Sequence, residues 1–225
     1  MLPEFPVRIP AFLRHLFPGL HFTGPATGKV LYLTFDDGPL PEFCPWILDC
    51  LASYDAKATF FLVGENALKH PELVTDIING GHSIGNHTFN HLNGFKTSTG
   101  SYLRNTDACR EVLQAHLSLG VAPLFRPPYG KIRPSQIRQL RKAGYEIIFW
   151  DVLSKDYKAD LSAEELFRNV VDNSRPGSIL VFHDNLKAEK KLRSALPLIL
   201  SELKKQGYRF EALRFPPKKA IDVKA

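Results

Sequence analysis

Short apolar runs alternate with amphipathic stretches along most of this chain. The runs are rich in β-branched and aromatic residues, which predicts buried strands; they cover 30–35, 58–63, 82–86, 124–125, 145–150, 178–182 and 208–213. Between them, apolar residues recur at helical spacing, which predicts helices over 43–54, 71–78, 102–119, 134–143, 162–173 and 192–206. The chain therefore alternates strand and helix.

This alternation indicates an α/β protein with a parallel sheet, because parallel neighbours need a long crossover that is usually a helix. No Gly-rich phosphate loop follows the first predicted strand, so a barrel is favoured over a dinucleotide-binding sheet. A length of 225 residues is common for one such barrel. We expect a single domain over 1–225, with 1–28 as an N-terminal extension.

The N-terminal extension has prolines at positions 3, 6, 10 and 18 that interrupt its apolar residues. This pattern predicts neither a signal peptide nor a transmembrane segment, so a cytoplasmic or cell-envelope-associated protein is expected. Apolar residues beside basic ones predict a short amphipathic turn that closes one end of the barrel: Phe12, Leu13, Leu16 and Phe17. Weak association with a membrane surface is the alternative.

Composition adds two exclusions. Lys plus Arg number 29 against 23 Asp plus Glu, a net charge of +6 that fits an anionic polymer or membrane surface nearby. No aromatic residues interleave with the basic ones, so no nucleic-acid partner is expected. The three cysteines, Cys44, Cys50 and Cys109, lack zinc-site spacing and are too few for a disulfide framework, which predicts buried thiols in a reducing compartment.

Polar residues suited to catalysis follow five of the predicted strands. In α/β barrels, chemistry collects where the strands end. The groups are Asp36-Asp37 after the first strand, His87 and His91 after the third, Arg126 to Gly130 after the fourth, Asp151 to Tyr157 after the fifth, and His183-Asp184 after the sixth. Five such groups on one rim predict an active site.

Asp36 and Asp37 stand between a strand and a Gly-Pro turn. Adjacent side chains at a strand end point in different directions, so one carboxylate can bind a metal while the other acts as a general base. His87 and His91, four residues apart, complete a set of two histidines and one carboxylate with Asp37, which leaves coordination positions open. Taken alone, the aspartates are more typical of a turn, and the histidine pair of a surface or capping arrangement.

Two later groups carry a fixed cation, a backbone N–H and a further imidazole. Pro127 and Pro128 follow Arg126 and lack N–H groups, so the N–H of Tyr129 is expected to point at a developing oxyanion. An apolar strand brings His183 to the rim, where a nearby carboxylate would raise its pKa and make it a general acid. The simpler interpretations are a proline-stiffened loop and a half-buried structural histidine.

These five groups resemble, in order, the motifs of NodB-type polysaccharide deacetylases, carbohydrate esterase family four. The motifs are TFDDGP at 34–39, HTFNH at 87–91, RPPYG at 126–130, DVLSKDY at 151–157 and VFHD at 181–184, and the resemblance spans about residues 30–213. It implies a distorted (β/α)7 barrel and one divalent metal ion, commonly zinc, with cobalt, nickel or manganese as alternatives. It also implies removal of N-acetyl groups from N-acetylglucosamine-containing glycans, with release of acetate.

Position by position, the resemblance implies that Asp37, His87 and His91 hold the metal. The implied catalytic residues are Asp36 as base, His183 as acid, Arg126 and Asp156 as their respective partners, and Tyr129 as oxyanion donor; Pro127, Pro128, Tyr157 and Val181 line the substrate pocket. Tyr157 stands where the family usually has Trp, and Val181 where it usually has Leu. These two departures concern the shape of the acyl pocket and leave every reacting group in place.

Several alternatives accompany this prediction. The same chemistry on an O-acetyl ester or a non-sugar amide is one. An iron-dependent oxygenase could use two histidines and a carboxylate, but it would explain neither Asp36 nor His183. A non-catalytic carbohydrate-binding barrel predicts a damaged site, and none is visible. The expected substrate is a peptidoglycan, chitin-like or lipid-linked aminosugar glycan or oligosaccharide, with contacts from Lys96 to Tyr102, and the expected state is a monomer.

Overall fold

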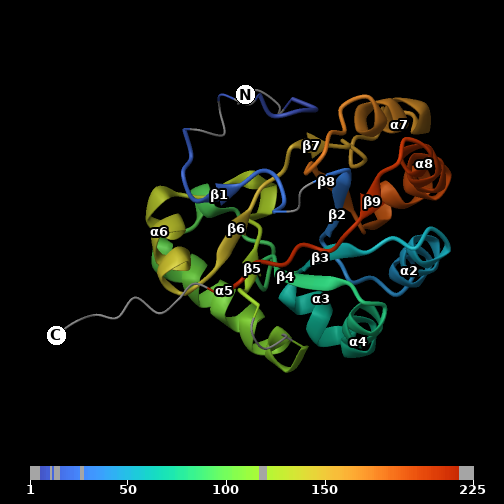
Figure 1. The fold of residues 1–225 in the computed structure, drawn as a ribbon. Helices are drawn as coiled ribbons and strands as arrows, with labels where there is room; N and C mark the ends of the chain where they lie inside the picture. The colour runs from blue at the N-terminus through green and yellow to red at the C-terminus, as the bar shows by residue number, and fades with distance from the viewer. Residues whose placement is uncertain (1–5, 11, 13–15, 26–27, 117–120, 218–225) are drawn as a thin grey trace.

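The sheet consists of parallel strands curled around a central axis, with helices on the outside (Figure 1). A computed structural model of the chain describes residues 6–10, 12, 16–25, 28–116 and 121–217. The strand order is β1-β6-β5-β4-β3-β2-β8-β7, and β9 also pairs with β2. The strands are β1 (Leu20–His21), β2 (Val30–Asp36), β3 (Ala58–Leu62), β4 (Ser83–Asn86), β5 (Leu124–Phe125), β6 (Glu146–Ile148), β7 (Val152–Leu153), β8 (Ile179–His183) and β9 (Arg209–Phe210).

One extended segment closes this sheet into a distorted barrel. β6 pairs with β5 and β1, whereas β7 pairs with β8 at the other end of the strand order. Only residues 149–151 separate β6 from β7, so the same segment is hydrogen-bonded to both ends of the sheet. The apolar pattern predicts one strand at 145–150 and does not reveal β7, because a two-residue strand is too short to show a periodic pattern.

The N-terminal extension takes part in the sheet, which its sequence pattern does not predict. β1 pairs with β6, and residues 7–9 run antiparallel to β7 through the bonds from Leu153 N to Val7 O and from Ile9 N to Asp151 O. Of the predicted amphipathic turn, Leu13 lies outside the described residues. Its described members, Phe12, Leu16 and Phe17, are exposed. Among the described residues, no helix is both long enough and apolar enough to cross a membrane.

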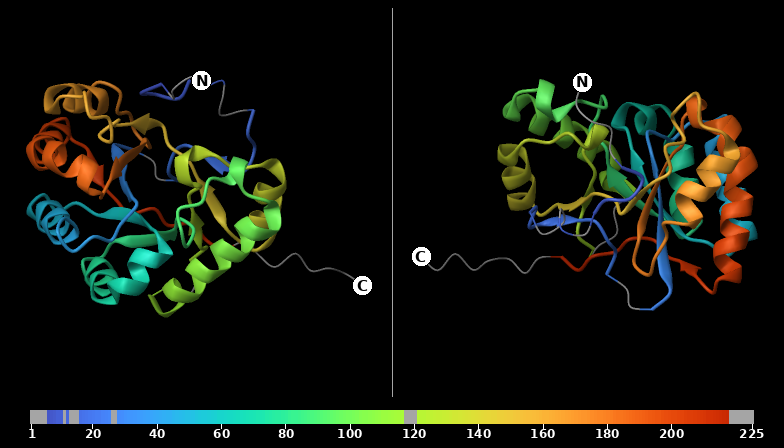
Figure 2. Two further views of the ribbon diagram at one scale, coloured as in Figure 1. Left: turned by 180° about the vertical axis from the view of Figure 1, so that it is seen from behind. Right: turned by 90° about the horizontal axis from the view of Figure 1, so that it is seen from above.

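The helices surround the barrel, as the two further views show (Figure 2). They are α2 (Cys44–Ser53), α3 (Gly64–Lys69), α4 (Pro71–Asn79), α5 (Thr99–Leu113), α6 (Pro134–Lys142), α7 (Ala163–Val171) and α8 (Leu186–Lys205), with 3₁₀ turns η1 (Gly94–Lys96), η2 (Gln114–His116) and η3 (Pro128–Gly130). A capping box joins Ser162 and Glu165 at the start of α7. α3 was not predicted, and α5 starts at residue 99 rather than 102. α8 starts at 186 rather than 192, because its first turn is mostly charged and shows no apolar periodicity.

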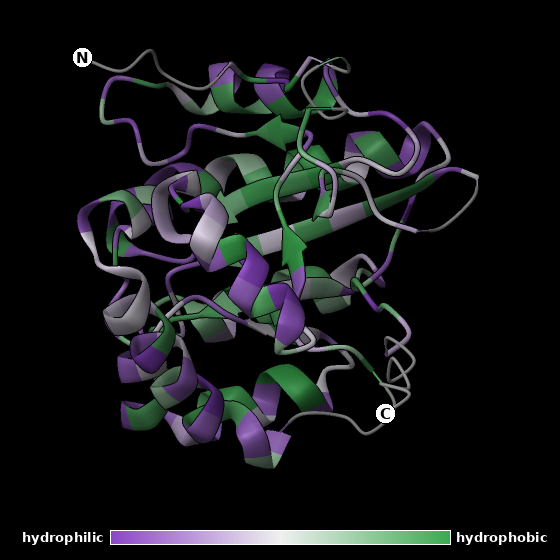
Figure 3. Cartoon of the chain, turned by 90° about the vertical axis from the view of Figure 1, so that its left-hand side faces the viewer, coloured by the Kyte–Doolittle hydropathy of each residue, from purple (hydrophilic) through white to green (hydrophobic). Residues whose placement is uncertain are grey.

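β2 and β3 are buried along their whole length, and Figure 3 shows the strands mostly in the hydrophobic colour. Along β2, Leu31, Leu33 and Phe35 pack with helix residues in one core cluster, whereas Val30 and Tyr32 belong to a second cluster inside the barrel. Side chains alternate between the two faces of a strand. The inward series therefore continues through Thr34 to Asp36, and this places polar groups at the carboxyl end of the barrel interior.

Candidate active site

Strand register places Asp36 beside His183. In the parallel pair of β2 and β8, Tyr32 is opposite Ile179, Thr34 is opposite Val181, and Asp36 is opposite His183. Ile179 and Val181 belong to the interior cluster, so His183 continues the inward series of β8 as Asp36 continues that of β2. The two titratable groups predicted from different motifs thus end neighbouring strands on the same face.

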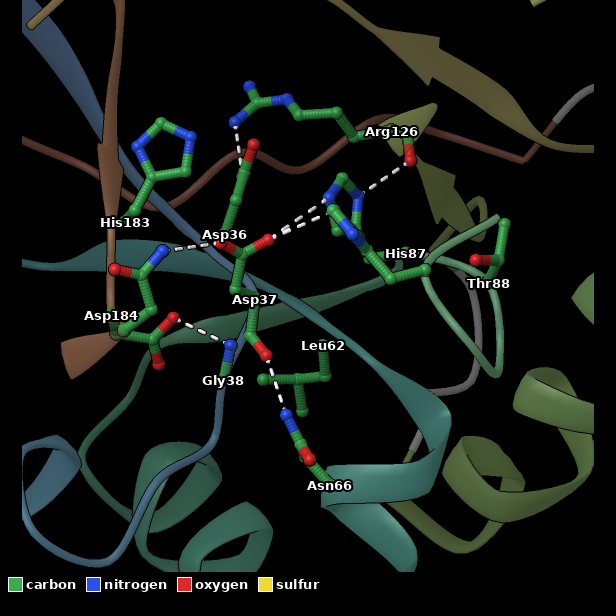
Figure 4. A network of polar contacts seen from close by, with 12 residues as sticks. Asp36, Asp37, Gly38, Leu62, Asn66, His87, Thr88, Arg126, His183 and Asp184 are labelled. Atoms are coloured by element: carbon green, nitrogen blue, oxygen red, sulfur yellow. Dashed lines mark hydrogen bonds and ion pairs between the residues drawn. The ribbon is translucent and has the colours of Figure 1, made fainter. Parts of the chain in front are cut away.

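Arg126 is fully buried and binds Asp36. Its Nη1 donates to Oδ1 of Asp36 at 2.7 Å (Figure 4). The same Nη1 donates to Oγ1 of Thr34 at 2.6 Å. Its Nε and Nη2 donate to the carbonyl oxygens of Ile148 and Phe149, at 3.3 and 3.0 Å. These carbonyls lie where the closing segment leaves β6, so one guanidinium orients Asp36 and satisfies backbone acceptors at the break in the strand.

Asp37, His87 and His91 converge on one point, as predicted. Their candidate ligand atoms all lie within 4.8 Å of one another. Oδ1 of Asp37 is 3.1 Å from Nε2 of His91 and 3.7 Å from Nε2 of His87. Ligands about 2.0–2.1 Å from a tetrahedral zinc ion are separated by about 3.3 Å, so these spacings suit such an ion.

The protonation states of this triad also suit a metal. Nδ1 of His87 lies 2.8 Å from the carbonyl oxygen of Arg126, which can only accept a hydrogen bond, so Nδ1 carries the proton and Nε2 presents its lone pair to the centre. Burial lowers the pKa of His87 to about 4, which keeps the ring neutral. Burial raises the pKa of Asp37, but the hydrogen bond from His91 and the positive charge of His183 outweigh burial and hold that pKa well below its usual range.

The backbone of Asp37 is turned out of the strand. Its φ of 91° lies in the left-handed region, which directs the side chain away from that of Asp36. Asn66 stabilises the turn, because its Nδ2 donates to the carbonyl oxygen of Asp37 at 2.8 Å (Figure 4). The prediction that adjacent carboxylates point in different directions is confirmed.

His183 is held by Asp156. Oδ1 of Asp156 lies 2.7 Å from Nδ1 of the imidazole, and its Oδ2 accepts from the backbone N–H of His183 at 2.7 Å. Burial favours the neutral ring, but the charge and hydrogen bond of the fully buried Asp156 overcome it, and the carboxylates of Asp37 and Asp36 add to the effect, so the pKa of His183 rises to about 10. With Nδ1 facing Asp156, Nε2 carries the second proton.

We expect this pair to make stability depend on pH. The folded pKa of about 10 exceeds the unfolded value of 6.5, so the stabilisation is complete below pH 6.5 and is lost as the pH rises to 10. Asp156→Asn removes the largest attraction to the charged ring, so this variant should lose less unfolding free energy over that interval, by on the order of 2 kcal/mol. Urea unfolding of metal-free protein at several pH values measures the difference. Equal slopes in parent and variant would contradict the assignment.

Strained backbone marks the rim of the site. Five of the six non-glycine residues with positive φ in the described part of the chain lie in loops that follow strands of the barrel, and they are Asp37, Thr88, His91, Tyr129 and Lys155. Tyr129, with φ of 60°, sits in η3 after the two prolines, and its ring packs 4.5 Å from that of His91. No acceptor for its backbone N–H occurs among the residues that the structure describes. That N–H is therefore available, as predicted.

The predicted pocket residues lie at the same end of the barrel. Pro127, Pro128 and Val181 are buried, while Tyr157 is 38% exposed and its ring stands edge-on to His183 at 5.2 Å. The expectation that contacts extend to Tyr102 is wrong for that residue. It lies in α5, is fully buried, and packs against Phe125 in the barrel interior.

The sequence assigned no role to several residues that support the site. Thr34 bridges Arg126 to the carbonyl oxygen of Leu180 through its hydroxyl. Asp184 is fully buried and accepts from Gly38 N at 2.7 Å, where a Cβ on the glycine would lie 1.8 Å from Asp184 Oδ2. Asn185 contacts Asp37 and begins α8. Among these residues, only Asn185 could have been assigned a role from the sequence, because an asparagine directly before a helix is typical of an N-cap.

Comparison with known proteins gives consistent similarities. The family model described as "Polysaccharide deacetylase" matches residues 23–148. A peptidoglycan-N-acetylglucosamine deacetylase of Bacillus cereus is 41% identical over 194 residues, which cover 85% of this chain and 70% of that protein. A chitooligosaccharide deacetylase of Azorhizobium caulinodans is 34% identical over 154 residues, which cover 68% of this chain and 73% of that protein.

A solved structure shows the same likeness in three dimensions. The crystal structure of a peptidoglycan N-acetylglucosamine deacetylase in complex with 4-naphthalen-1-yl-N-oxidanyl-benzamide superposes with a TM-score of 0.82. The two sequences are 37% identical, and the match covers 91% of this chain and 95% of the other. The predicted distorted barrel is therefore confirmed.

Proposed function

The chain belongs to the polysaccharide deacetylase family, and on that premise we propose that it is a metal-dependent hydrolase that removes N-acetyl groups from an N-acetylglucosamine-containing glycan. The observation that carries the proposal is the juxtaposition of two separate units. One is the Asp37, His87 and His91 triad, and the other is the Asp36–Arg126 pair next to His183. Binding of a sugar alone would need neither a general base nor an acid.

Asp37, His87 and His91 would hold the ion, with zinc as the expected metal because two imidazoles and one carboxylate are typical of hydrolytic zinc sites. When bound, such an ion polarises a carbonyl and makes a water molecule more acidic. The carboxylate of Asp36, which accepts a hydrogen bond from Arg126 through Oδ1, takes a proton from the attacking water. The new bond joins the water oxygen to the acetamide carbon.

The remaining residues act on the charge and the leaving group. The N–H of Tyr129 donates to the carbonyl oxygen as it becomes an oxyanion. His183 then gives the proton on Nε2 to the sugar nitrogen as the carbon–nitrogen bond breaks, because Asp156 binds its Nδ1. The products are acetate and a free amine. The oxygen of water is now bonded to the acetyl carbon, and the sugar nitrogen has gained a proton. Tyr157, Val181, Pro127 and Pro128 would surround the acetyl group.

Two other functions fit the contacts less well. An iron-dependent oxygenase would use the triad but would leave the base pair of Asp36 with Arg126 and the raised pKa of His183 unexplained. A non-catalytic barrel would tolerate loss of any reacting group, yet each predicted one lies at the site. The alternative of an ester or non-sugar amide substrate keeps the same residues and differs only in the pocket.

The substrate is proposed from the relatives. Both are named for N-acetylated aminosugar polymers or oligomers, one for peptidoglycan and one for chitooligosaccharide. We propose peptidoglycan as the substrate, since the more similar relative acts on it and the net charge of +6 suits an anionic wall polymer. Acetate release from peptidoglycan fragments, compared with neutral N-acetylglucosamine oligomers of equal length, distinguishes the two.

Metal removal is the direct test of the proposed chemistry. Chelation should reduce acetate release at least about 10³-fold, because the ion both activates water and polarises the carbonyl. Zinc or cobalt added back should restore it. His91→Ala should lose both activity and stoichiometric zinc, whereas His116→Ala, in η2 away from the triad, should keep both. Full activity of the metal-stripped protein would contradict the proposal.

A further inference from the structure

Asn185 connects the start of helix α8 to the carboxylate of Asp37. Its Nδ2 donates a 2.7 Å hydrogen bond to Oδ2 of Asp37. Its Oδ1 accepts from the backbone N–H groups of Lys187 and Ala188, at 3.0 and 3.1 Å, as the N-cap of the helix. One short side chain therefore makes both contacts.

The orientation of this amide follows from the partners. The two N–H groups of the helix can only donate, so they require the oxygen of Asn185. The carboxylate of Asp37 can only accept, so it requires the nitrogen. Neither contact survives a flip of the amide, and the first turn of a 20-residue helix thus fixes the direction of the N–H toward Asp37.

The contact divides the two oxygens of Asp37 between separate partners. Oδ1 faces His87 and His91, at 3.7 and 3.1 Å from their Nε2 atoms, while Oδ2 is bound by Asn185. A carboxylate can bind a metal through one oxygen or through both. A hydrogen bond to Oδ2 uses one lone pair of that oxygen and fixes the plane of the group, so Oδ1 is the oxygen that faces the two histidines.

We propose that Asn185 is a positioning residue that orients Asp37 so that Oδ1 is the oxygen presented to the ion. The inference rests on the metal site proposed above. A second oxygen from Asp37 would occupy one of the coordination positions that water and the substrate carbonyl need, and hydrolytic sites keep such a position open. Hydrogen-bond partners of metal ligands typically contribute about 10–100-fold in metal affinity or activity.

The competing interpretation is that Asn185 only caps α8. Asn185→Ser separates the two roles, because serine is also a good N-cap acceptor but has no donor that reaches Asp37. Asn185→Ala removes both the cap and the donor. Ser162→Ala is the matched control, since Ser162 caps α7 through a 3.1 Å bond from Glu165 N.

The experiment measures the zinc dissociation constant of the full chain by competition with a chromogenic chelator, and the unfolding midpoint of the metal-free protein. We expect Asn185→Ser and Asn185→Ala to weaken zinc binding equally, by about 10–100-fold. Ser162→Ala should keep the parent zinc affinity and lower the midpoint by about 2–4 °C. In Asn185→Ser the midpoint should change by less than about 2 °C.

The opposite pattern overturns the proposal. If Asn185→Ser binds zinc like the parent, the donor has no role, whether or not Asn185→Ala is weakened through the loss of the cap. Failure of the parent itself to bind zinc would refute the proposed metal site and, with it, any role of Asn185 there. The two failures are therefore distinguishable, and neither measurement depends on the substrate.

Discussion

Replacement of Asp36 by asparagine is expected to lower kcat for acetate release by about 10²–10⁴-fold. The side chain is buried, and its Oδ1 accepts from Arg126, so asparagine keeps the size of the group and one acceptor oxygen. The variant loses the basicity that takes a proton from water. The loss should therefore appear in kcat at saturating N-acetylglucosamine oligomer, with zinc restored, and leave KM within a few-fold.

Zinc content distinguishes this role from ligation. Asp36→Asn should bind one zinc ion per chain with the affinity of the parent, because the ligand set belongs to Asp37 and the two histidines. Asp49→Asn, at an exposed position of α2, is the matched control and should leave both kcat and zinc binding unchanged. A variant of Asp36 with the kcat of the parent would mean that another group is the base.

Replacement of Arg126 by methionine is expected to have the largest effect on stability, a loss of about 3–5 kcal/mol of unfolding free energy. Methionine fills much of the space but leaves the buried carboxylate of Asp36 without its cation. It also leaves the carbonyl oxygens of Ile148 and Phe149 without the donors that satisfy them. Urea unfolding at pH 7 measures the loss. Arg168→Met, which removes an exposed 3.7 Å pair with Glu164, should cost less than about 1 kcal/mol.

A double variant tests the cause of that loss. Asp36→Asn combined with Arg126→Met leaves no buried unpaired charge, so it should be more stable than the sum of the single losses predicts, by roughly 1–3 kcal/mol. The backbone acceptors still lack donors, so recovery should be incomplete. Strict additivity of the two substitutions would mean that the ion pair does not account for the loss.

Sequence alone could predict the framework because the pattern of each main strand is explicit. β2 is an apolar run whose inward positions end in Asp36, and β8 repeats this with His183. Two strand ends that face the same interior must bring their terminal side chains together. The order of strand and helix therefore predicted both the barrel and the rim on which the reacting groups meet.

Other features depend on contacts that no local pattern records. Asn185 and Asp37 are 148 residues apart, and Asn66 and Asp37 are 29 apart. A single asparagine leaves no repeating pattern in the sequence, so its contact with a distant residue can be identified only in the folded structure. β1 and β7 contain two residues each, too few for the alternation that identifies a strand. The tautomer of His87 likewise depends on where the carbonyl of Arg126 lies.

The position of Arg126 has an evolutionary consequence. Its guanidinium serves the base and also the backbone of the segment that joins both ends of the sheet. In a lineage that abandoned hydrolysis, exchange of Asp36 for a neutral residue would remove one acceptor of Arg126. Loss of the arginine would also leave the carbonyl oxygens of Ile148 and Phe149 without donors. In inactive descendants of this protein, we therefore expect Arg126 to be retained after Asp36 has been replaced.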